Sequence, residues 1–188
     1  MTVKRDLDVV GIDLCKNNAE CTWAKILIAR QNPVLVGCYY RSNSEHTVEQ
    51  IEELEKVLEH VQENHNPNQK HTVLLGGDFN VPHINWETGT IDSRCSSRSM
   101  YEKLMEVVDD NDLHQVQLQP TRKDSVLDLL FTNKPSLVDS ISILPGISDH
   151  DVVIVDKSLS ISINTKAPRK IKQWSKTDWD KLRSEVLE

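Results

Sequence analysis

The stretch Thr72-Val-Leu-Leu-Gly-Gly-Asp-Phe-Asn80 joins an apolar run to a polar pair. Residues 73–75 have the composition of a short buried strand, and the glycines after them let the backbone turn or approach another segment closely. Asp78 and Asn80 stand at positions i and i+2, which point to the same face of a strand. A carboxylate beside a carboxamide can activate a water and orient an oxygen-rich substrate, which suits phosphoester hydrolysis. The alternative interpretation of the pair is an Asx-turn that follows the strand.

Size and composition set broad limits on the function. The chain has 188 residues, enough for one domain with a substantial core. It is 38% hydrophobic and 27% charged, as is usual for a soluble protein. The net charge of −7 argues against tight non-specific DNA binding, because such binding needs a basic surface. It does not exclude a nuclease, since a metal site itself gathers carboxylates.

The cysteines and the N-terminus indicate the compartment. Cys15, Cys21, Cys38 and Cys95 form no C-x-x-C pair and predict reduced thiols in an intracellular protein. The first residues contain no apolar segment of the kind found in secretory signals. No apolar run is long enough to cross a membrane, so we expect no membrane partner.

The segments before Thr72 predict three strands and a helix. Apolar alternation predicts strands over residues 7–14, 22–29 and 34–40, and the turn at 31–33 makes the last two typical of an antiparallel hairpin. Thr47 with Gln50 forms a capping-box pattern at a helix start. The apolar stripe of this helix consists of Val48, Ile51, Leu54, Leu58 and Val61. The stripe is too short for a coiled coil, so we expect it to pack on a sheet.

The segments after Asn80 complete the predicted fold. Residues 81–97 resemble a loop, and Ser99 with Glu102 predicts the cap of a second helix that ends near Asp110. Further strands are predicted over residues 116–118, 126–132, 141–144 and 152–155. Strands and helices mix without strict β-α-β order, which indicates a layered α/β sandwich with a mixed sheet.

Two further stretches carry polar groups suited to chemistry. Ser148-Asp149-His150 follows a Pro-Gly turn and precedes an apolar strand, and Asp128 lies inside the apolar run 126–131. Burial of a carboxylate without a partner is costly, and a histidine is the natural partner because the carboxylate would fix its tautomer and raise its pKa. The alternatives are a solvated Asp128 at a sheet edge and a surface His150 at a polar strand entry.

These motifs, in this order, resemble the endonuclease/exonuclease/phosphatase family, which includes apurinic/apyrimidinic endonucleases, deoxyribonuclease I and inositol-polyphosphate phosphatases. The resemblance rests on Gly77-Asp78-Phe79-Asn80, on Leu127 to Phe131 and on Ser148-Asp149-His150. Tyr40-Arg-Ser-Asn43 is similar to the family's Tyr-x-Pro-Asn segment, with Ser42 in place of proline. The resemblance implies a layered α/β sandwich with mixed, mainly antiparallel sheets.

Details of sequence are most similar to the endonuclease domain of non-LTR (LINE-type) retrotransposons. The segments that carry this likeness are Gly37 to Arg41, Pro120 to Arg122, Leu127 to Asn133 and Trp174 to Trp179. The resemblance extends from about Thr22 to Glu188 and implies DNA as the substrate, a neighbouring reverse-transcriptase domain in the full-length element, and a nuclear location.

The resemblance also implies a role for each matching residue. Asp78 would orient or deprotonate the attacking water, Asn80 would hold that water or a phosphate oxygen, and Tyr40 would contact the phosphate. His150, supported by Asp128, would donate to a non-bridging oxygen in the transition state. The cofactor would be Mg²⁺ or Mn²⁺.

The resemblance also implies that Asp149 would bind the Mg²⁺ or Mn²⁺ ion directly or through water.

The family begins with strands that carry an asparagine and a principal glutamate ligand, and by this comparison the chain starts after both. We therefore expect an N-terminally truncated domain, formed by residues 1–163, with impaired activity. Residues 164–188 would be a basic linker and the start of a helical segment toward the reverse transcriptase, with solvation of the basic run favoured over nucleic-acid contact. The alternatives are a non-catalytic remnant of the domain and a phosphatase-type esterase on the same fold.

Overall fold

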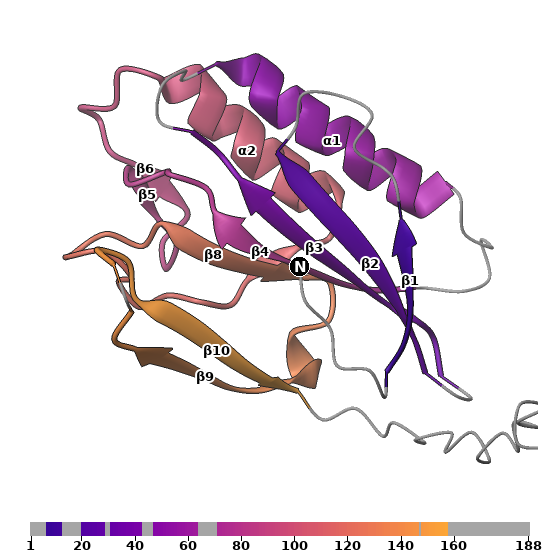
Figure 1. The fold of residues 1–188 in the computed structure, drawn as a ribbon. Coiled ribbons are helices and arrows are strands. Elements are labelled where there is room, and N and C mark those ends of the chain that lie inside the picture. The colour runs from indigo at the N-terminus through magenta and orange to yellow at the C-terminus, as the bar shows by residue number, and fades with distance from the viewer. Residues whose placement is uncertain are drawn as a thin grey trace, which may run out of the picture.

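The computed structural model describes residues 7–12, 20–28, 31–42, 47–63, 71–146 and 148–157. These residues form a six-stranded sheet, a two-stranded sheet, a small hairpin and two α-helices. Figure 1 shows the two helices side by side over one face of the large sheet, with the two-stranded sheet on the opposite side. The predicted layered α/β architecture is therefore confirmed.

The large sheet has the order β1-β2-β3-β4-β8-β7. Its strands are β1 (Asp8–Ile12), β2 (Cys21–Leu27), β3 (Val34–Tyr40), β4 (Thr72–Asp78), β7 (His114–Gln115) and β8 (Asp128–Thr132). β3 and β4 run parallel, and the other neighbouring pairs are antiparallel. The sheet is thus mixed and mainly antiparallel, and the predicted β2–β3 hairpin is present.

Both helices bury an apolar stripe against this sheet. α1 (Val48–Glu63) begins directly after the predicted cap at Thr47, and its stripe residues Ile51 and Leu54 are almost fully buried. α2 (Arg98–Asp110) buries Met100 and Leu104 beside it. These side chains join Leu35, Leu75, Phe79 and Phe131 in one core, where apolar burial supplies most of the stability.

The predicted cap of α2 is wrong. The N-cap position is Ser97, which makes no side-chain cap hydrogen bond, and Ser99 already lies inside the helix. The Glu102 side chain instead accepts a hydrogen bond of 2.8 Å from the Arg98 guanidinium, four residues earlier. An ion pair at this spacing replaces the predicted capping box.

The segment predicted to be a loop, residues 81–97, contains a hairpin of β5 (Ile84–Asn85) and β6 (Thr90–Ile91). The Asn85 Oδ1 atom accepts hydrogen bonds from the backbone N–H groups of Glu87 and Thr88 and so closes the turn. The Asn85 side chain therefore stabilises the turn between two strands that are too short to show an alternating pattern.

The strand predicted over residues 116–118 is wrong, because the strand of this segment is β7 (His114–Gln115) and glutamine side chains supply part of the pairing beyond it. The Gln115 Oε1 atom accepts from the Leu130 N–H at 2.9 Å, and the Gln117 Nε2 atom donates to the Asp128 carbonyl at 3.2 Å. Gln117 is 1% exposed. Together with the backbone hydrogen bond of 2.9 Å from the Val116 N–H to the Leu130 carbonyl, these side chains satisfy the edge of β8.

The second sheet pairs β9 (Val138–Leu144) with β10 (Val152–Lys157) in antiparallel register. It begins after a short 3₁₀ helix, Pro135–Leu137. The strands predicted over 141–144 and 152–155 are confirmed within these two elements.

Other predictions have mixed outcomes. Cys38 and Cys95 are free thiols, but Cys21 is disulfide-bonded, so the prediction of reduced thiols is wrong for this residue. Neither helix in the part of the chain that the structure describes has the length and apolar character needed to cross a membrane. The predicted linker 164–188 lies outside the described residues.

Candidate active site

Three candidate residues meet because of the register of the large sheet. Tyr40 on β3 is aligned with Asp78 on β4, and Asp78 is aligned with Asp128 on β8. Aligned positions on neighbouring strands point to the same face. The adjacent Tyr39 and Leu129 point into the helix-covered core, so Tyr40, Asp78 and Asp128 lie on the opposite face, at one end of the sheet.

His150 completes a cluster with the two carboxylates. Its Nδ1 atom lies 2.9 Å from Asp128 Oδ2, the contact that the sequence predicted, and its Nε2 atom lies 4.0 Å from Asp78 Oδ2. Each of the three side chains is about four-fifths buried, with exposures of 19% for Asp78 and 22% for the other two. One ligand atom from each lies within 4.8 Å of the others.

Loop contacts hold His150 at this position. The Asp151 N–H donates to the Thr121 carbonyl at 2.7 Å, and the Thr121 hydroxyl accepts from the Asp128 N–H at 3.2 Å. Thr121 is fully buried and therefore links the His150 loop to the start of β8. Gly146 adds a close approach, because a β-carbon there would fall 1.8 Å from the His150 carbonyl oxygen.

The environment of Asp78 disfavours its charged form. Burial raises the pKa of this carboxyl group, and the nearby Asp128 carboxylate raises it further, against a lowering influence from the Asn80 N–H and from His150. Two partly buried carboxylates that face one imidazole form an arrangement that positive charge would stabilise.

Asn80 combines the two interpretations of the polar pair. Its backbone N–H donates to Asp78 Oδ1 at 3.1 Å, as in an Asx-turn, and its φ is 51°. Asn80 therefore lies beyond the strand, and the prediction that strand alternation aligns it with Asp78 is wrong. Its side-chain Nδ2 atom donates to the Arg41 carbonyl at 2.7 Å. The residue is 5% exposed and lines a small cavity of about 260 Å³ together with Arg122 and Lys123.

Tyr40 and Asp149 lie at the margin of the cluster. Tyr40 is 48% exposed at the end of β3. The Asp149 side chain is 65% exposed and lies 2.5 Å from Arg122, whose positive charge lowers the pKa of the Asp149 carboxyl group. Asp149 is thus next to the three-residue cluster in sequence but is not one of its members.

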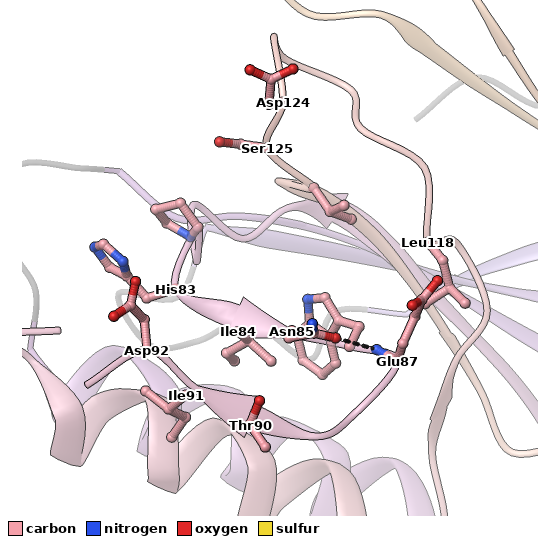
Figure 2. A pocket seen from close by; sticks show the side chains of 13 residues that line it. His83, Ile84, Asn85, Glu87, Thr90, Ile91, Asp92, Leu118, Asp124 and Ser125 are labelled. Atoms are coloured by element: carbon pink, nitrogen blue, oxygen red, sulfur yellow. Dashed lines mark hydrogen bonds between the residues drawn. The ribbon is translucent and has the colours of Figure 1, made fainter. Parts of the chain in front are cut away.

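A larger cavity of about 410 Å³ adjoins the small one, and both are lined by Pro82 and Ser125. Figure 2 shows that the β5–β6 hairpin forms its floor and the 124–125 loop its opposite wall. The carboxylates of Glu87, Asp92 and Asp124 give its lining an acidic character.

The residues of the cluster fit a divalent cation in their chemistry. Two carboxylates and one imidazole offer two oxygens and one nitrogen from a partly buried position. Carboxylate oxygens suit Mg²⁺ and Mn²⁺, and imidazole is tolerated by Mn²⁺ and other transition metals. A bound cation would relieve the repulsion between the Asp78 and Asp128 carboxylates, which helps to raise the pKa of Asp78.

Sequence reasoning missed the buried residues that support the site. Arg41, Gln117 and Thr121 are each at most 1% exposed and bind backbone groups next to the cluster. Arg41 and Thr121 lie within the segments that carry the family resemblance, and nothing in their local pattern indicates burial. Their hydrogen-bond partners are distant in the chain, so the sequence gives no local signal of this role.

Several solved structures are similar to this chain. It is similar to a beta toxin from Staphylococcus aureus at 12% identity and a TM-score of 0.47, over 75% of this chain and 58% of that one. It is similar to an endonuclease/exonuclease/phosphatase from Beutenbergia cavernae at 16% identity and a TM-score of 0.48, over 79% of this chain and 43% of that one. It is also similar to an endonuclease/exonuclease/phosphatase family protein from Bacteroides thetaiotaomicron at 15% identity and a TM-score of 0.39, over 79% of this chain and 61% of that one. The chain therefore spans less than two thirds of each of these structures.

No curated protein matches the sequence. The family model described as endonuclease–reverse transcriptase matches residues 34–154, which is well over half of the chain. This range contains β3, β4 and β8 and all three residues of the Asp78–Asp128–His150 cluster. The chain therefore belongs to the endonuclease–reverse transcriptase family of endonuclease/exonuclease/phosphatase domains.

Proposed function

We propose that this chain is a metal-dependent DNA endonuclease domain of a retrotransposon-derived protein that acts in the nucleus next to a reverse-transcriptase domain. One observation carries the proposal. Asp78, Asp128 and His150 come from segments far apart in the sequence and present their ligand atoms within 4.8 Å of one another at one end of the sheet. Such a constellation in a partly buried position is typical of hydrolytic sites.

His150 is the proposed donor to the phosphate. Asp128 accepts a hydrogen bond from the Nδ1–H, which leaves the Nε2 atom to face the reacting group. In the protonated imidazolium, Nε2–H can donate to a non-bridging oxygen and stabilise the charge that develops on it. Asp128 thus orients the ring through this hydrogen bond.

Asp78 is the proposed acceptor for the proton of the attacking water. Its carboxylate lies within 4.0 Å of His150 Nε2, so a water between the two groups would be within reach of both. Asn80 is fixed beside it by the hydrogen bond from the Asn80 N–H to Asp78 Oδ1. Tyr40, exposed at the aligned position of β3, is placed to contact a phosphate oxygen.

The carboxylate oxygens of Asp78 and Asp128 would hold a Mg²⁺ or Mn²⁺ ion, with Asp149 as the further ligand that the family resemblance implies. The protonated His150 would donate to the phosphate and would not be a ligand of the cation. When bound, the cation would offset charge on the leaving oxygen. Asp149 would have to exchange its present contact with Arg122 for this role.

Nicking of supercoiled plasmid DNA with Mg²⁺ or Mn²⁺ tests the proposal. We expect Asp78→Ala and His150→Ala to lower the rate about 10²–10⁴-fold, the usual contribution of a general acid or base. The matched controls are Asp139→Ala and His114→Ala, which remove the same groups from exposed positions and should leave the rate unchanged.

Two results would contradict the proposal. Absence of nicking by the unaltered protein under these conditions would favour the non-catalytic remnant. Metal-dependent release of phosphate from a phosphomonoester without nicking of DNA would favour the phosphatase-type esterase.

A further inference from the structure

Arg41 is a buried cation directly after β3. It is 1% exposed, and its guanidinium donates from Nε to the Phe79 carbonyl at 2.7 Å and from Nη2 to the Asn80 carbonyl at 2.5 Å. A buried charge is tolerated when its donors are used in hydrogen bonds. The acceptors here are the two carbonyl groups that directly follow Asp78, the last residue of β4.

Two further hydrogen bonds join the same segments through the Arg41 backbone. The Arg41 backbone N–H donates to the Asp78 carbonyl at 2.9 Å, and the Asn80 Nδ2 atom donates to the Arg41 carbonyl at 2.7 Å. Arg41 thus makes four hydrogen bonds to three consecutive residues, 78 to 80. We name this set of contacts the Arg41 clamp.

The Arg41 clamp holds a segment with an uncommon backbone conformation. Asn80 has a left-handed backbone, with φ of 51°, which few non-glycine residues adopt and which asparagine adopts more often than most. The guanidinium fixes the carbonyl of the Phe79–Asn80 peptide and the carbonyl of the peptide that follows it. The orientation of the Phe79–Asn80 peptide sets the direction of the Asn80 N–H, which donates a hydrogen bond to Asp78 Oδ1.

We propose that Arg41 is a positioning residue that fixes Asp78 and Asn80 for phosphodiester hydrolysis, an inference that rests on the proposed function. Arginine suits the task because its planar group presents two donors in a fixed relation, matching two adjacent carbonyls. A lysine ammonium is a single point of charge and cannot hold both carbonyls in one geometry.

Arg41→Lys is the first test variant, and amide hydrogen exchange of the full chain is the first measurement. We expect exchange at the Phe79 and Asn80 amides to accelerate about tenfold or more, because local opening no longer breaks the guanidinium contacts. The Leu75 amide, in the middle of β4, should keep its rate. Uniform acceleration, or no change at Phe79 and Asn80, would overturn the proposal.

The second measurement is plasmid nicking, separated into kcat and KM. We expect Arg41→Lys to lower kcat about 10²-fold with KM for DNA within about twofold, since misplacement of the catalytic groups affects the reaction more than binding. Arg98→Lys, at an exposed arginine of α2, is the conservative control. Leu104→Ala, in the core of α2, controls for lost stability and should keep kcat per folded molecule.

Arg41→Met guards against a variant that fails to fold, because an apolar side chain of similar length often replaces a buried ion without loss of the fold. A folded Arg41→Met protein should show the same loss of kcat. Failure of both variants to fold would overturn the proposal, since Arg41 would then be a general structural residue. Absence of nicking in the unaltered protein would defeat the proposed function, and the exchange measurement would still decide whether Arg41 positions residues 78 to 80.

Discussion

Phe79 connects the hydrophobic core to the candidate site. Removal of its ring should affect both the stability of the fold and the position of Asp78 and Asn80, and a matched control can distinguish the two effects. The residue stands between Asp78 and Asn80 and is fully buried. Its ring lies 4.8 Å from the Tyr39 ring and 5.1 Å from the Phe131 ring, measured between centroids. Phe79→Ala removes this ring and leaves a cavity, which should lower the free energy of unfolding by about 3–5 kcal/mol.

Phe131→Ala is the matched control. Phe131 is also fully buried and contacts two aromatic rings, Phe79 and Trp86 at 5.1 and 5.5 Å, but no proposed catalytic residue adjoins it in the chain. We expect the same range of destabilisation for Phe131→Ala. Nicking per folded molecule should fall about 10²-fold for Phe79→Ala alone, because a misplaced catalytic group costs about this much.

Urea unfolding followed by tryptophan fluorescence measures the stability, and circular dichroism gives the folded fraction used to normalise the nicking rate. Phe79→Leu nearly conserves volume, so it should cost less than about 1.5 kcal/mol and keep most of the activity. Equal nicking by folded Phe79→Ala and Phe131→Ala would refute the reasoning, since the core would then not determine the position of the site.

Three further predictions concern residues close to the cluster in the strands and in the loop before β8. Gly77→Ala should destabilise by about 3 kcal/mol or more in urea unfolding, because φ is 148° and the new β-carbon would fall 1.8 Å from the Tyr39 carbonyl oxygen. Gly76→Ala, whose β-carbon would meet its nearest neighbour at 3.4 Å, should change stability by less than about 1 kcal/mol, and equal effects would contradict this account. Burial raises the pKa of Tyr39 from 10.0 to about 12, so its stabilising contribution is complete below pH 10 and is lost as pH rises through about 12. Between pH 10 and about 12, the free energy of unfolding should therefore fall less in Tyr39→Phe than in the unaltered protein, by up to about 3 kcal/mol. Parallel pH profiles of the two proteins in urea unfolding would disprove this prediction. Thr121→Val should cost about 1–3 kcal/mol by leaving the Asp128 N–H without its hydroxyl acceptor, and unchanged urea unfolding would show that this bond is dispensable.

The sequence by itself determined the elements that have long apolar patterns. β3, β4, α1 and the body of α2 lie where period-2 and period-3.6 patterns predict them, because burial of one face or stripe is a local property of the chain. The partnership of Asp128 with His150 was also predictable, since a carboxylate inside an apolar run requires a nearby partner.

Only the tertiary structure decided the register that aligns Tyr40, Asp78 and Asp128. It also decided that Asp149 contacts Arg122 and that Arg41 binds the backbone of residues 79 and 80. These contacts join segments separated by about 30 to 40 positions or more, and no local pattern encodes which pairs will meet.

The same reason explains the errors in the short elements. β7 ends where the side chains of Gln115 and Gln117 take over the hydrogen bonds of β8, and the β5–β6 hairpin is closed by the Asn85 side chain. A strand of two residues has no period to detect, and its existence depends on the backbone groups that a distant neighbour leaves unpaired.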